Sequence, residues 1–224
     1  KGMRILEIGC GQGDTTVVLA DAVGPTGQVV AIDIASKEYG APITLGEASE
    51  TISKSPLGQT IDFYYETDFL QFDIQEPFDV AVLSHCSWYF HSPEILEAYL
   101  KKLKSVAKRV CFAEWDIDYT LPSQRAHFCA ANILALYSAF VEDDGNIQNL
   151  FHKSHIKTLI ENTGFTITNE QTVDASYLQD GQWEVDYSNY LLNEFPKIPA
   201  KIQSLIDSYA YLMKEQQEPV LSLN

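Results

Sequence analysis

Short apolar runs alternate with segments of helical periodicity along most of the 224-residue chain. The first run, RILEIG at residues 4–9, is bounded by glycine and is typical of a central strand that is covered on both faces. A helix is predicted from Asp14 onward, and Gly24 with Pro25 ends it. This alternation indicates β-α units around a mostly parallel sheet.

The alternation continues to about residue 120 and then changes character. Ser92, Pro93 and Glu94 supply an N-cap, a first-turn proline and an acid for the clearest amphipathic helix. Residues 141–146 are predicted to form a loop, and residues 177–195 are aromatic and polar with little periodicity. The other predicted strands are residues 28–34, 61–69, 78–85, 109–117 and 165–173, and the helices are residues 45–53, 93–106, 123–140, 155–162 and a segment that Pro199 opens.

Composition narrows the class of protein. Hydrophobic residues make up 46% of the chain, which is enough for a substantial core and favours one domain. Lys and Arg total 15 against 31 Asp and Glu, and the resulting net charge of −16 disfavours nucleic acid as a partner. No run approaches the ~18 apolar residues that cross a bilayer, and no signal region is visible. We therefore expect a soluble, cytoplasmic protein with no membrane partner.

The four cysteines are scattered without a C-x-x-C pair, at Cys10, Cys86, Cys111 and Cys129. Such spacing disfavours a zinc site, which needs close pairs of thiols or histidines. We expect buried free thiols in a reducing compartment.

Three glycines follow the first strand at alternate positions, Gly9, Gly11 and Gly13. Without side chains they let main-chain N–H groups approach a ligand at the carboxyl edge of the sheet, although a plain strand-to-helix corner also explains them. Glu7 precedes and Asp14 follows the glycines. Two carboxylates are unfavourable beside a pyrophosphate, so the loop suits a ligand with a cationic end.

The pattern E-x-G-x-G-x-G, from Glu7 to Gly13, resembles the first motif of the class I S-adenosylmethionine-dependent methyltransferases. The resemblance covers residues 4–120 and is generic beyond them. It implies a Rossmann-like, doubly wound α/β fold whose seven strands follow the order 3-2-1-4-5-7-6, the seventh antiparallel. That strand would begin near Val220 and run past the given end, and the family's N-terminal helix is missing, so we expect both ends to be trimmed.

The resemblance also implies a cofactor, S-adenosyl-L-methionine, whose amino-acid and ribose part the glycine loop wraps. Asp33 would accept hydrogen bonds from both ribose hydroxyls, although an NAD site also places an acid there. Asp68 would accept the adenine amino group and Phe69 would cover the base, and a turn cap is the alternative for Asp68. The implied cofactor residues are Glu7, Gly9, Cys10, Gly11, Gly13, Asp33, Ile34, Asp68, Phe69 and Ser84.

Residues 83–90, LSHCSWYF, leave the fourth strand where the family brings substrate to the methyl group. Methyl transfer needs alignment above all, and a general base only if the nucleophile arrives protonated. His85 is our candidate for that base, and a structural histidine is the alternative. The candidate substrate contacts are Trp88, Tyr89, Glu114 and Trp115, although aromatic residues after a strand are more often ordinary core.

A run of acids, Glu114, Asp116 and Asp118, follows the fifth strand at alternate positions. Oxygen ligands at this spacing are compatible with Mg²⁺ and equally with solvent. The fourth strand ends in Ser84, where metal-using relatives carry an acid, and we therefore predict no metal.

We expect a single methyltransferase domain over residues 1–224, with a cofactor-binding half at residues 1–120 and a substrate-side cap at residues 121–150 and 174–218. Aromatic side chains in the second cap segment would form a lid that closes over a small-molecule substrate. A homodimer interface explains the same aromatic residues equally well. These residues are Tyr177, Trp183, Tyr187 and Tyr190.

The sequence thus predicts an S-adenosylmethionine-dependent methyltransferase that acts on a small molecule, with the acceptor atom (O, N or C) undetermined. An NAD(P)-dependent oxidoreductase is one alternative. A non-catalytic protein that binds S-adenosylmethionine is the other.

Overall fold

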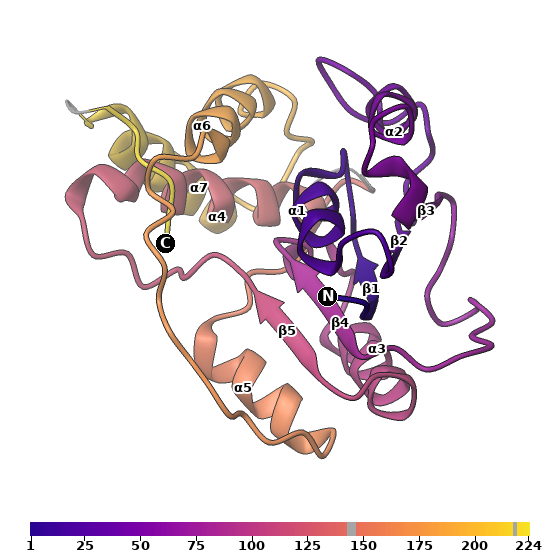
Figure 1. Ribbon diagram of the computed structural model, residues 1–224. Coiled ribbons are helices and arrows are strands. Elements are labelled where there is room, and N and C mark those ends of the chain that lie inside the picture. The colour runs from indigo at the N-terminus through magenta and orange to yellow at the C-terminus, as the bar shows by residue number, and fades with distance from the viewer. Residues whose placement is uncertain (143–146, 217–218) are drawn as a thin grey trace. The chain divides into compact units, whose positions relative to one another are not determined.

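The computed structural model describes residues 1–142, 147–216 and 219–224 (Figure 1). The chain divides into two compact units. The sheet unit consists of Lys1–Ser87, Glu94–Glu114 and Thr163–Phe165, and the helical unit consists of Trp88–Pro93, Trp115–Asn162 and Thr166–Asn224. The loop predicted at residues 141–146 falls mostly outside the described residues.

A five-stranded parallel sheet forms the centre of the sheet unit. Its strand order, β3-β2-β1-β4-β5, confirms the Rossmann-like order predicted for the first five strands. The central strand β1 is almost entirely buried, and it pairs with β2 through Ile5 and Val29 and with β4 through Ile5 and Val80. The strands are β1 (Arg4–Ile8), β2 (Gln28–Ile32), β3 (Ile61–Tyr64), β4 (Val80–Ser84) and β5 (Val110–Ala113).

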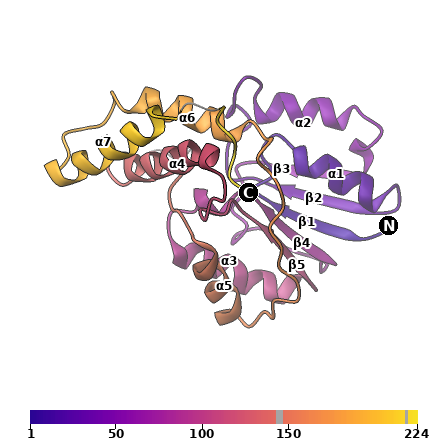
Figure 2. The ribbon, with the colours of Figure 1, turned by 90° about the vertical axis from the view of Figure 1, so that its left-hand side faces the viewer.

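Helices cover both faces of this sheet, with α1 (Asp14–Val23) and α2 (Leu45–Ser53) on one face and α3 (Pro93–Val106) on the other (Figure 2). Local sequence explains their bounds: Gly24 caps α1, and Thr44 with Glu47 forms a capping box that starts α2. The core beneath α1 and α2 takes alternate residues of four strands, because successive strand side chains point to opposite faces. It includes Ile5, Val29, Ala31, Ile61, Val80 and Val82, packed with Ala20, Val23 and Leu45.

The helical unit contains α4 (Arg125–Ser138), α5 (Lys153–Asn162), α6 (Asp180–Leu191) and α7 (Ala200–Lys214). Helix α4 packs against both α6 and α7. Small residues of α4 allow this close packing, and their core is Ala126, Cys129, Ala130, Ile133, Val185, Ala210 and Met213. Three short 3₁₀ turns complete the described elements: η1 (Gly58–Thr60), η2 (Ser87–Tyr89) and η3 (Pro122–Gln124).

The last residues of the chain are buried inside the helical unit rather than paired in the sheet. The backbone N–H of Leu221 donates to the Ser123 carbonyl at 3.1 Å, and the side-chain amide of Gln124 donates to the Ser222 carbonyl at 2.9 Å. The N–H of Ser222 donates to the Ser176 carbonyl at 3.1 Å. These bonds satisfy polar groups that are buried with the segment.

Two predicted strands are absent from the described residues: residues 165–173 and the segment near Val220. Phe165 and Ile167 still alternate with exposed neighbours, as a strand would. Alternation alone is insufficient, because a strand needs a ladder partner for its backbone groups.

One helix was missed and one further expectation was wrong. Residues 177–195, which show little periodicity in the sequence, contain a regular helix, α6. Cys111 is exposed, because alternate residues of β5 face outward, whereas Cys10, Cys86 and Cys129 are buried free thiols as predicted. Among the described residues, no helix has both the length and the apolar character needed to cross a membrane.

Candidate functional site

The glycine loop leaves β1 and bends sharply against the end of β2. The backbone N–H groups of Gly9 and Cys10 both donate to the Ile32 carbonyl, at 2.8 and 3.2 Å. The N–H of Gly13 donates to the Cys10 carbonyl at 2.9 Å, which closes the turn before α1. All three loop glycines have positive φ, between +51° and +92°, a conformation that other residues adopt at a cost.

The three glycines differ in what surrounds them. A Cβ on Gly9 would lie 2.5 Å from the Cβ of Cys86, and a Cβ on Gly13 would lie 2.6 Å from the Cδ1 of Ile52. A Cβ on Gly11 would meet no heavy atom within 4 Å. The loop therefore packs tightly at its two ends and faces open space at its centre.

Asp33 follows β2 and holds the centre of this loop. Its Oδ2 accepts a hydrogen bond from the Gly11 N–H at 2.8 Å, and its Oδ1 accepts one from the Ala35 N–H at 2.9 Å. A carboxylate offers about four acceptor positions, so each oxygen keeps capacity for a further donor. Asp33 thus shapes the loop and still presents acceptors beside it.

Glu7 lies on β1, where only 1% of its surface is exposed, and its Oε2 accepts a hydrogen bond from the Thr16 hydroxyl at 2.6 Å. Burial raises the pKa of Glu7 from 4.5 to about 7, against the opposing effect of the Thr16 bond, and Asp33 and Asp14 raise it further. The carboxyl is therefore balanced between its two protonation states near neutral pH. A cation bound at the loop would favour the ionised form.

Asp68 lies in the loop after β3, next to Asp33 along the sheet edge. The N–H of Thr67 donates to the Asp33 carbonyl at 3.0 Å, which ties the two loops together. The Oδ1 of Asp68 accepts from the Leu70 N–H at 2.9 Å and from the Tyr99 hydroxyl at 2.7 Å. The turn-capping role weighed for Asp68 is thus present, and its Oδ2 has no hydrogen-bond partner within the described part of the chain.

Phe69 does not lie where the sequence predicted. Its exposed fraction is 0%, and its ring packs 5.3 Å from the Tyr99 ring and beneath the Lys102 ammonium. A ring without exposed surface cannot cover a bound base in this structure. Ile34, which follows Asp33, is 70% exposed and presents an apolar surface at the same edge.

The two remaining predicted cofactor residues occupy the ends of β1 and β4. Burial is the main cause that raises the pKa of the Cys10 thiol, with Asp33 and Glu7 adding to it, so this thiol is not a nucleophile. Ser84 is half-buried at the end of β4, in register with Ala113.

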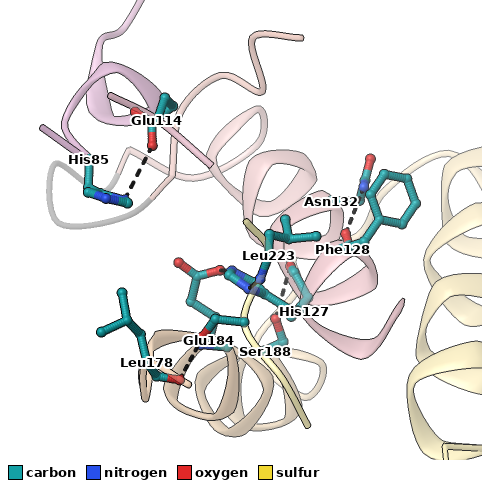
Figure 3. A network of polar contacts seen from close by, with 12 residues as sticks. His85, Glu114, His127, Phe128, Asn132, Leu178, Glu184, Ser188 and Leu223 are labelled. Carbon is teal, nitrogen blue, oxygen red and sulfur yellow. Dashed lines mark hydrogen bonds and ion pairs between the residues drawn. The ribbon is translucent and has the colours of Figure 1, made fainter. Parts of the chain in front are cut away.

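His85 stands directly after β4 in a left-handed backbone conformation, with φ of +50°. Its Nδ1 lies 4.0 Å from the Oε1 of Glu114, as Figure 3 shows. Ser87 holds the other carboxylate oxygen of Glu114 through its N–H at 2.8 Å and its hydroxyl at 2.6 Å. The sequence missed Ser87 and placed Glu114 with the substrate, whereas the structure places this carboxylate beside the imidazole.

The aromatic residues predicted to contact substrate differ in exposure. Trp88 is 2% exposed and Trp115 is also buried, with its ring 5.4 Å from the His127 ring, so both are interior residues of the helical unit. Ordinary core was the alternative weighed for the aromatic residues after the fourth strand, and the burial of Trp88 agrees with it. Tyr89 is exposed.

The acids after β5 are held by protein groups. Asp116 forms an ion pair with Lys153 and accepts a hydrogen bond from the Asp118 N–H. In the part of the chain that the structure describes, no three His, Cys, Asp or Glu side chains are grouped as a metal site requires.

Comparison with known proteins decides the family. Residues 1–170 match a family described as "Methyltransferase domain". The chain belongs to this methyltransferase family. Its Rossmann-like order and the loop between Glu7 and Asp14 are features of the S-adenosylmethionine-dependent members.

Two curated relatives of the methyltransferase come from Diaporthe leptostromiformis. Methyltransferase phomM is 31% identical over 163 residues, which are 63% of this chain and 42% of phomM, and methyltransferase phomM' is 30% identical over the same length. The matched region thus spans less than half of these relatives.

Solved structures extend the comparison. A cyclopropane-fatty-acyl-phospholipid synthase-like protein from Lactobacillus casei is 34% identical, with a TM-score of 0.87, over 99% of this chain and 81% of that one. An S-adenosylmethionine-dependent methyltransferase from Aquifex aeolicus, 18% identical over 75% of each chain with a TM-score of 0.51, shares the fold.

The residues of the glycine loop and of the two strand ends beside it fit the cofactor of this family, S-adenosylmethionine. Open space lies where a Cβ on Gly11 would project, as close approach of a ligand requires. Asp33 keeps acceptor capacity for hydroxyl groups, and the Oδ2 of Asp68 keeps capacity for an amino group. The acids of the loop suit a cation.

Proposed function

We propose that this protein transfers a methyl group from S-adenosylmethionine to a small-molecule acceptor. The observation that carries the proposal is the contact between the Gly11 N–H and the Asp33 Oδ2 at 2.8 Å. It fixes an open loop and an acceptor carboxylate side by side, as recognition of a ribose next to a cationic amino-acid end requires.

Each element of the site has a definite task in this proposal. The cofactor, when bound, supplies a methyl group on a positively charged sulfur. Asp33 binds the ribose hydroxyls, Asp68 binds the adenine amino group, and Glu7 with Asp14 favours the cationic end. Orientation of the reacting groups supplies most of the acceleration, worth roughly 7–11 kcal/mol where alignment is good.

His85 is the group that would remove a proton from the acceptor. Its Nδ1 faces Glu114 at 4.0 Å, so a proton on Nδ1 leaves the Nε2 lone pair as the base. Glu114 orients the ring and Ser87 orients Glu114. The Nε2 of His85 would take the acceptor's proton while the acceptor atom bonds to the methyl carbon, and the electron pair of the broken carbon–sulfur bond would leave with the sulfur.

A small-molecule acceptor is supported by charge. The net charge of −16 opposes approach to a phosphate backbone and to anionic lipid surfaces. The four free thiols favour the cytoplasmic location that we expected.

A second candidate follows from the similarity to the Lactobacillus casei protein, whose name refers to a cyclopropane-fatty-acyl-phospholipid synthase. Its acceptor would be the double bond of an unsaturated acyl chain rather than a polar small molecule. We rank this candidate second because the net negative charge of the protein disfavours binding to anionic lipid surfaces. A single assay distinguishes the two candidates.

That assay incubates the protein with labelled S-adenosylmethionine and either a metabolite extract or vesicles of unsaturated phospholipid, and identifies the labelled product by mass. A labelled polar metabolite supports the proposal, and a labelled lipid supports the second candidate. Tight cofactor binding without any product would indicate a non-catalytic binding protein. Calorimetric binding of NADH without S-adenosylmethionine binding would contradict the proposal.

Asp33→Ala provides the matching test of the site. Loss of its hydroxyl acceptors is expected to weaken S-adenosylhomocysteine binding by roughly 1–3 kcal/mol. Asp62→Ala, which alters an exposed acid of β3, is the control. An unchanged dissociation constant for Asp33→Ala would remove Asp33 from the cofactor site.

A further inference from the structure

Helix α3 reaches the loop after β3 through two side chains, Tyr99 and Lys102. They are three positions apart, so they lie on the same face of the helix. Tyr99 is buried and Lys102 is half-buried. Tyr99 belongs to the buried face of this helix, with Leu96, Leu100 and Leu103.

Tyr99 fixes one oxygen of Asp68. Its hydroxyl donates to Oδ1 at 2.7 Å, and the same oxygen accepts from the Leu70 N–H at 2.9 Å. Both bonds therefore fall on Oδ1, and Oδ2 is left without a hydrogen-bond partner among residues 1–142, 147–216 and 219–224. Burial, followed by the bond to Asp68, raises the pKa of Tyr99, which keeps the hydroxyl protonated as a donor.

Lys102 fixes the backbone of the same turn. Its ammonium donates to the carbonyl oxygens of Phe69 at 2.7 Å, Phe72 at 2.7 Å and Leu70 at 3.1 Å. The three donors of a lysine are thus all directed at one turn. The same ammonium lies 4.8 Å from the centre of the Phe69 ring, so it also holds that ring in the interior.

The hydrogen bonds of the Lys102 ammonium go beyond what packing alone requires. A lysine that only packed its aliphatic chain on the turn would keep its ammonium in water, because the charged group is well solvated there. Here the ammonium exchanges water for three carbonyl oxygens around the residues that follow Asp68. The bond between Thr67 and Asp33 then sets Asp68 beside the other acid of the site.

We propose that Tyr99 and Lys102 are positioning residues that set adenine specificity, by turning the Oδ2 of Asp68 toward the amino group of the cofactor base. This inference rests on the proposed function, because it assumes that the base lies at Asp68. A fixed carboxylate accepts from an amino group and repels a carbonyl oxygen. A loosely held carboxylate can rotate and discriminates less.

The test compares two ligands that differ at this position. S-adenosylhomocysteine carries the amino group, and S-inosylhomocysteine carries a carbonyl oxygen in its place. Isothermal titration measures the dissociation constant of each ligand for the wild type, Tyr99→Phe and Lys102→Met. The discrimination ratio is the dissociation constant of S-inosylhomocysteine divided by that of S-adenosylhomocysteine. Tyr65→Phe is the matched control, since it also removes a buried tyrosine hydroxyl, one that donates to the Leu45 carbonyl at 3.2 Å.

We expect Tyr99→Phe and Lys102→Met each to lower the discrimination ratio by roughly tenfold, mainly through weaker binding of S-adenosylhomocysteine. Tyr65→Phe is expected to leave the ratio unchanged, whatever it does to stability. A purely structural role for Tyr99 would lower the melting temperature and weaken both ligands equally.

Asp68→Asn separates the ways in which the proposal can fail. If this variant loses discrimination while Tyr99→Phe and Lys102→Met keep the wild-type ratio, the positioning role is wrong and the proposed function stands. If Asp68→Asn also keeps the ratio, the base does not lie at Asp68 and the inference is overturned with it. If neither ligand binds the wild type, the proposed function fails first. Should Tyr99→Phe not fold, Lys102→Met alone decides.

Discussion

The Nδ1 atom of His127 accepts a 2.8 Å hydrogen bond from the backbone N–H of Leu223, 96 residues further along the chain. The imidazole is fully buried, and its Nε2 lies 2.8 Å from the Oε2 of Glu184, a close polar contact that is not a hydrogen bond (Figure 3). A ring that accepts at Nδ1 carries its proton on Nε2. Within the helical unit, His127 therefore joins α4 to α6 and to the last residues.

Replacing His127 by alanine is expected to destabilise the protein by about 3 kcal/mol, because the Leu223 N–H and the Glu184 carboxylate lose a buried partner and a cavity remains. Urea denaturation measures the change. The exposed His152→Ala is the control and is expected to change stability by less than about 0.5 kcal/mol. Equal midpoints for the two variants would show that the buried contact is unimportant.

Glu7 gives the stability a definite pH dependence. Its pKa is about 7 in the folded chain, against 4.5 when exposed, so the folded state holds the proton more tightly than the unfolded state. The stabilisation from the protonated carboxyl is complete below about pH 4.5 and is lost as the pH rises through about 7, at a cost of about 3 kcal/mol.

Glu7→Gln keeps an acceptor for Thr16 and removes the ionisation. We expect the variant to be more stable than the wild type at pH 8 and about equal to it at pH 4.5. Unfolding free energies measured across this range check the difference. Parallel pH profiles for the two proteins would contradict the buried-carboxyl account.

The loop glycines are expected to respond differently to alanine. Gly9→Ala introduces a contact of 2.5 Å with Cys86 in addition to an unfavourable φ, and we expect a loss of at least about 3 kcal/mol. Gly11→Ala meets no neighbour and costs only the backbone conformation, about 1–2 kcal/mol. Thermal unfolding measures both.

Ligand binding adds a second readout for Gly11→Ala. Its methyl group projects into the open space where we propose that the cofactor binds, so S-adenosylhomocysteine affinity is expected to fall at least roughly tenfold despite a folded protein. Full affinity in the folded variant would mean that the ligand does not approach the loop there.

Helix α6 carries large aromatic residues on its exposed side, Trp183, Tyr187 and Tyr190, of which Trp183 is 59% and Tyr190 is 64% exposed. Replacing all three by alanine is expected to leave the fold intact at a cost of roughly 1–3 kcal/mol, because about half of each side chain is buried while the packed face of α6 is unchanged. The variant separates the two roles that we proposed. Loss of turnover at unchanged mass and cofactor affinity supports a lid, and dissociation of a dimer supports an interface.

The same residues explain why sequence reasoning missed α6. Its buried face is built from Gly181, Val185, Ser188 and Leu191, which are small or moderately apolar, while its largest aromatic residues face solvent. The positions of the most hydrophobic residues therefore did not indicate which face of the helix is packed. Helix α3, whose buried face is its most apolar one, was predicted from its start signals and its periodicity.

Part of the candidate site was predictable from local sequence features, and part depends on contacts between residues far apart in the chain. The loop from Glu7 to Asp14 and the acids Asp33 and Asp68 were predictable, because strand ends and glycine spacing are local features. The contacts of Tyr99 with Asp68 and of Ser87 with Glu114 join residues 31 and 27 positions apart, and no periodicity encodes such pairs. A polar hydroxyl on an otherwise apolar stripe was the one visible signal for Tyr99.

The tight packing of Gly9 against Cys86 also gives the molecule a built-in chemical reporter. Burial raises the pKa of the Cys86 thiol well above its usual range, so an alkylating reagent reaches a reactive thiolate there only when the loop swings away from the end of β4. The rate at which Cys86 is alkylated, with the exposed Cys111 as an internal reference, thus follows the opening of the loop without any label.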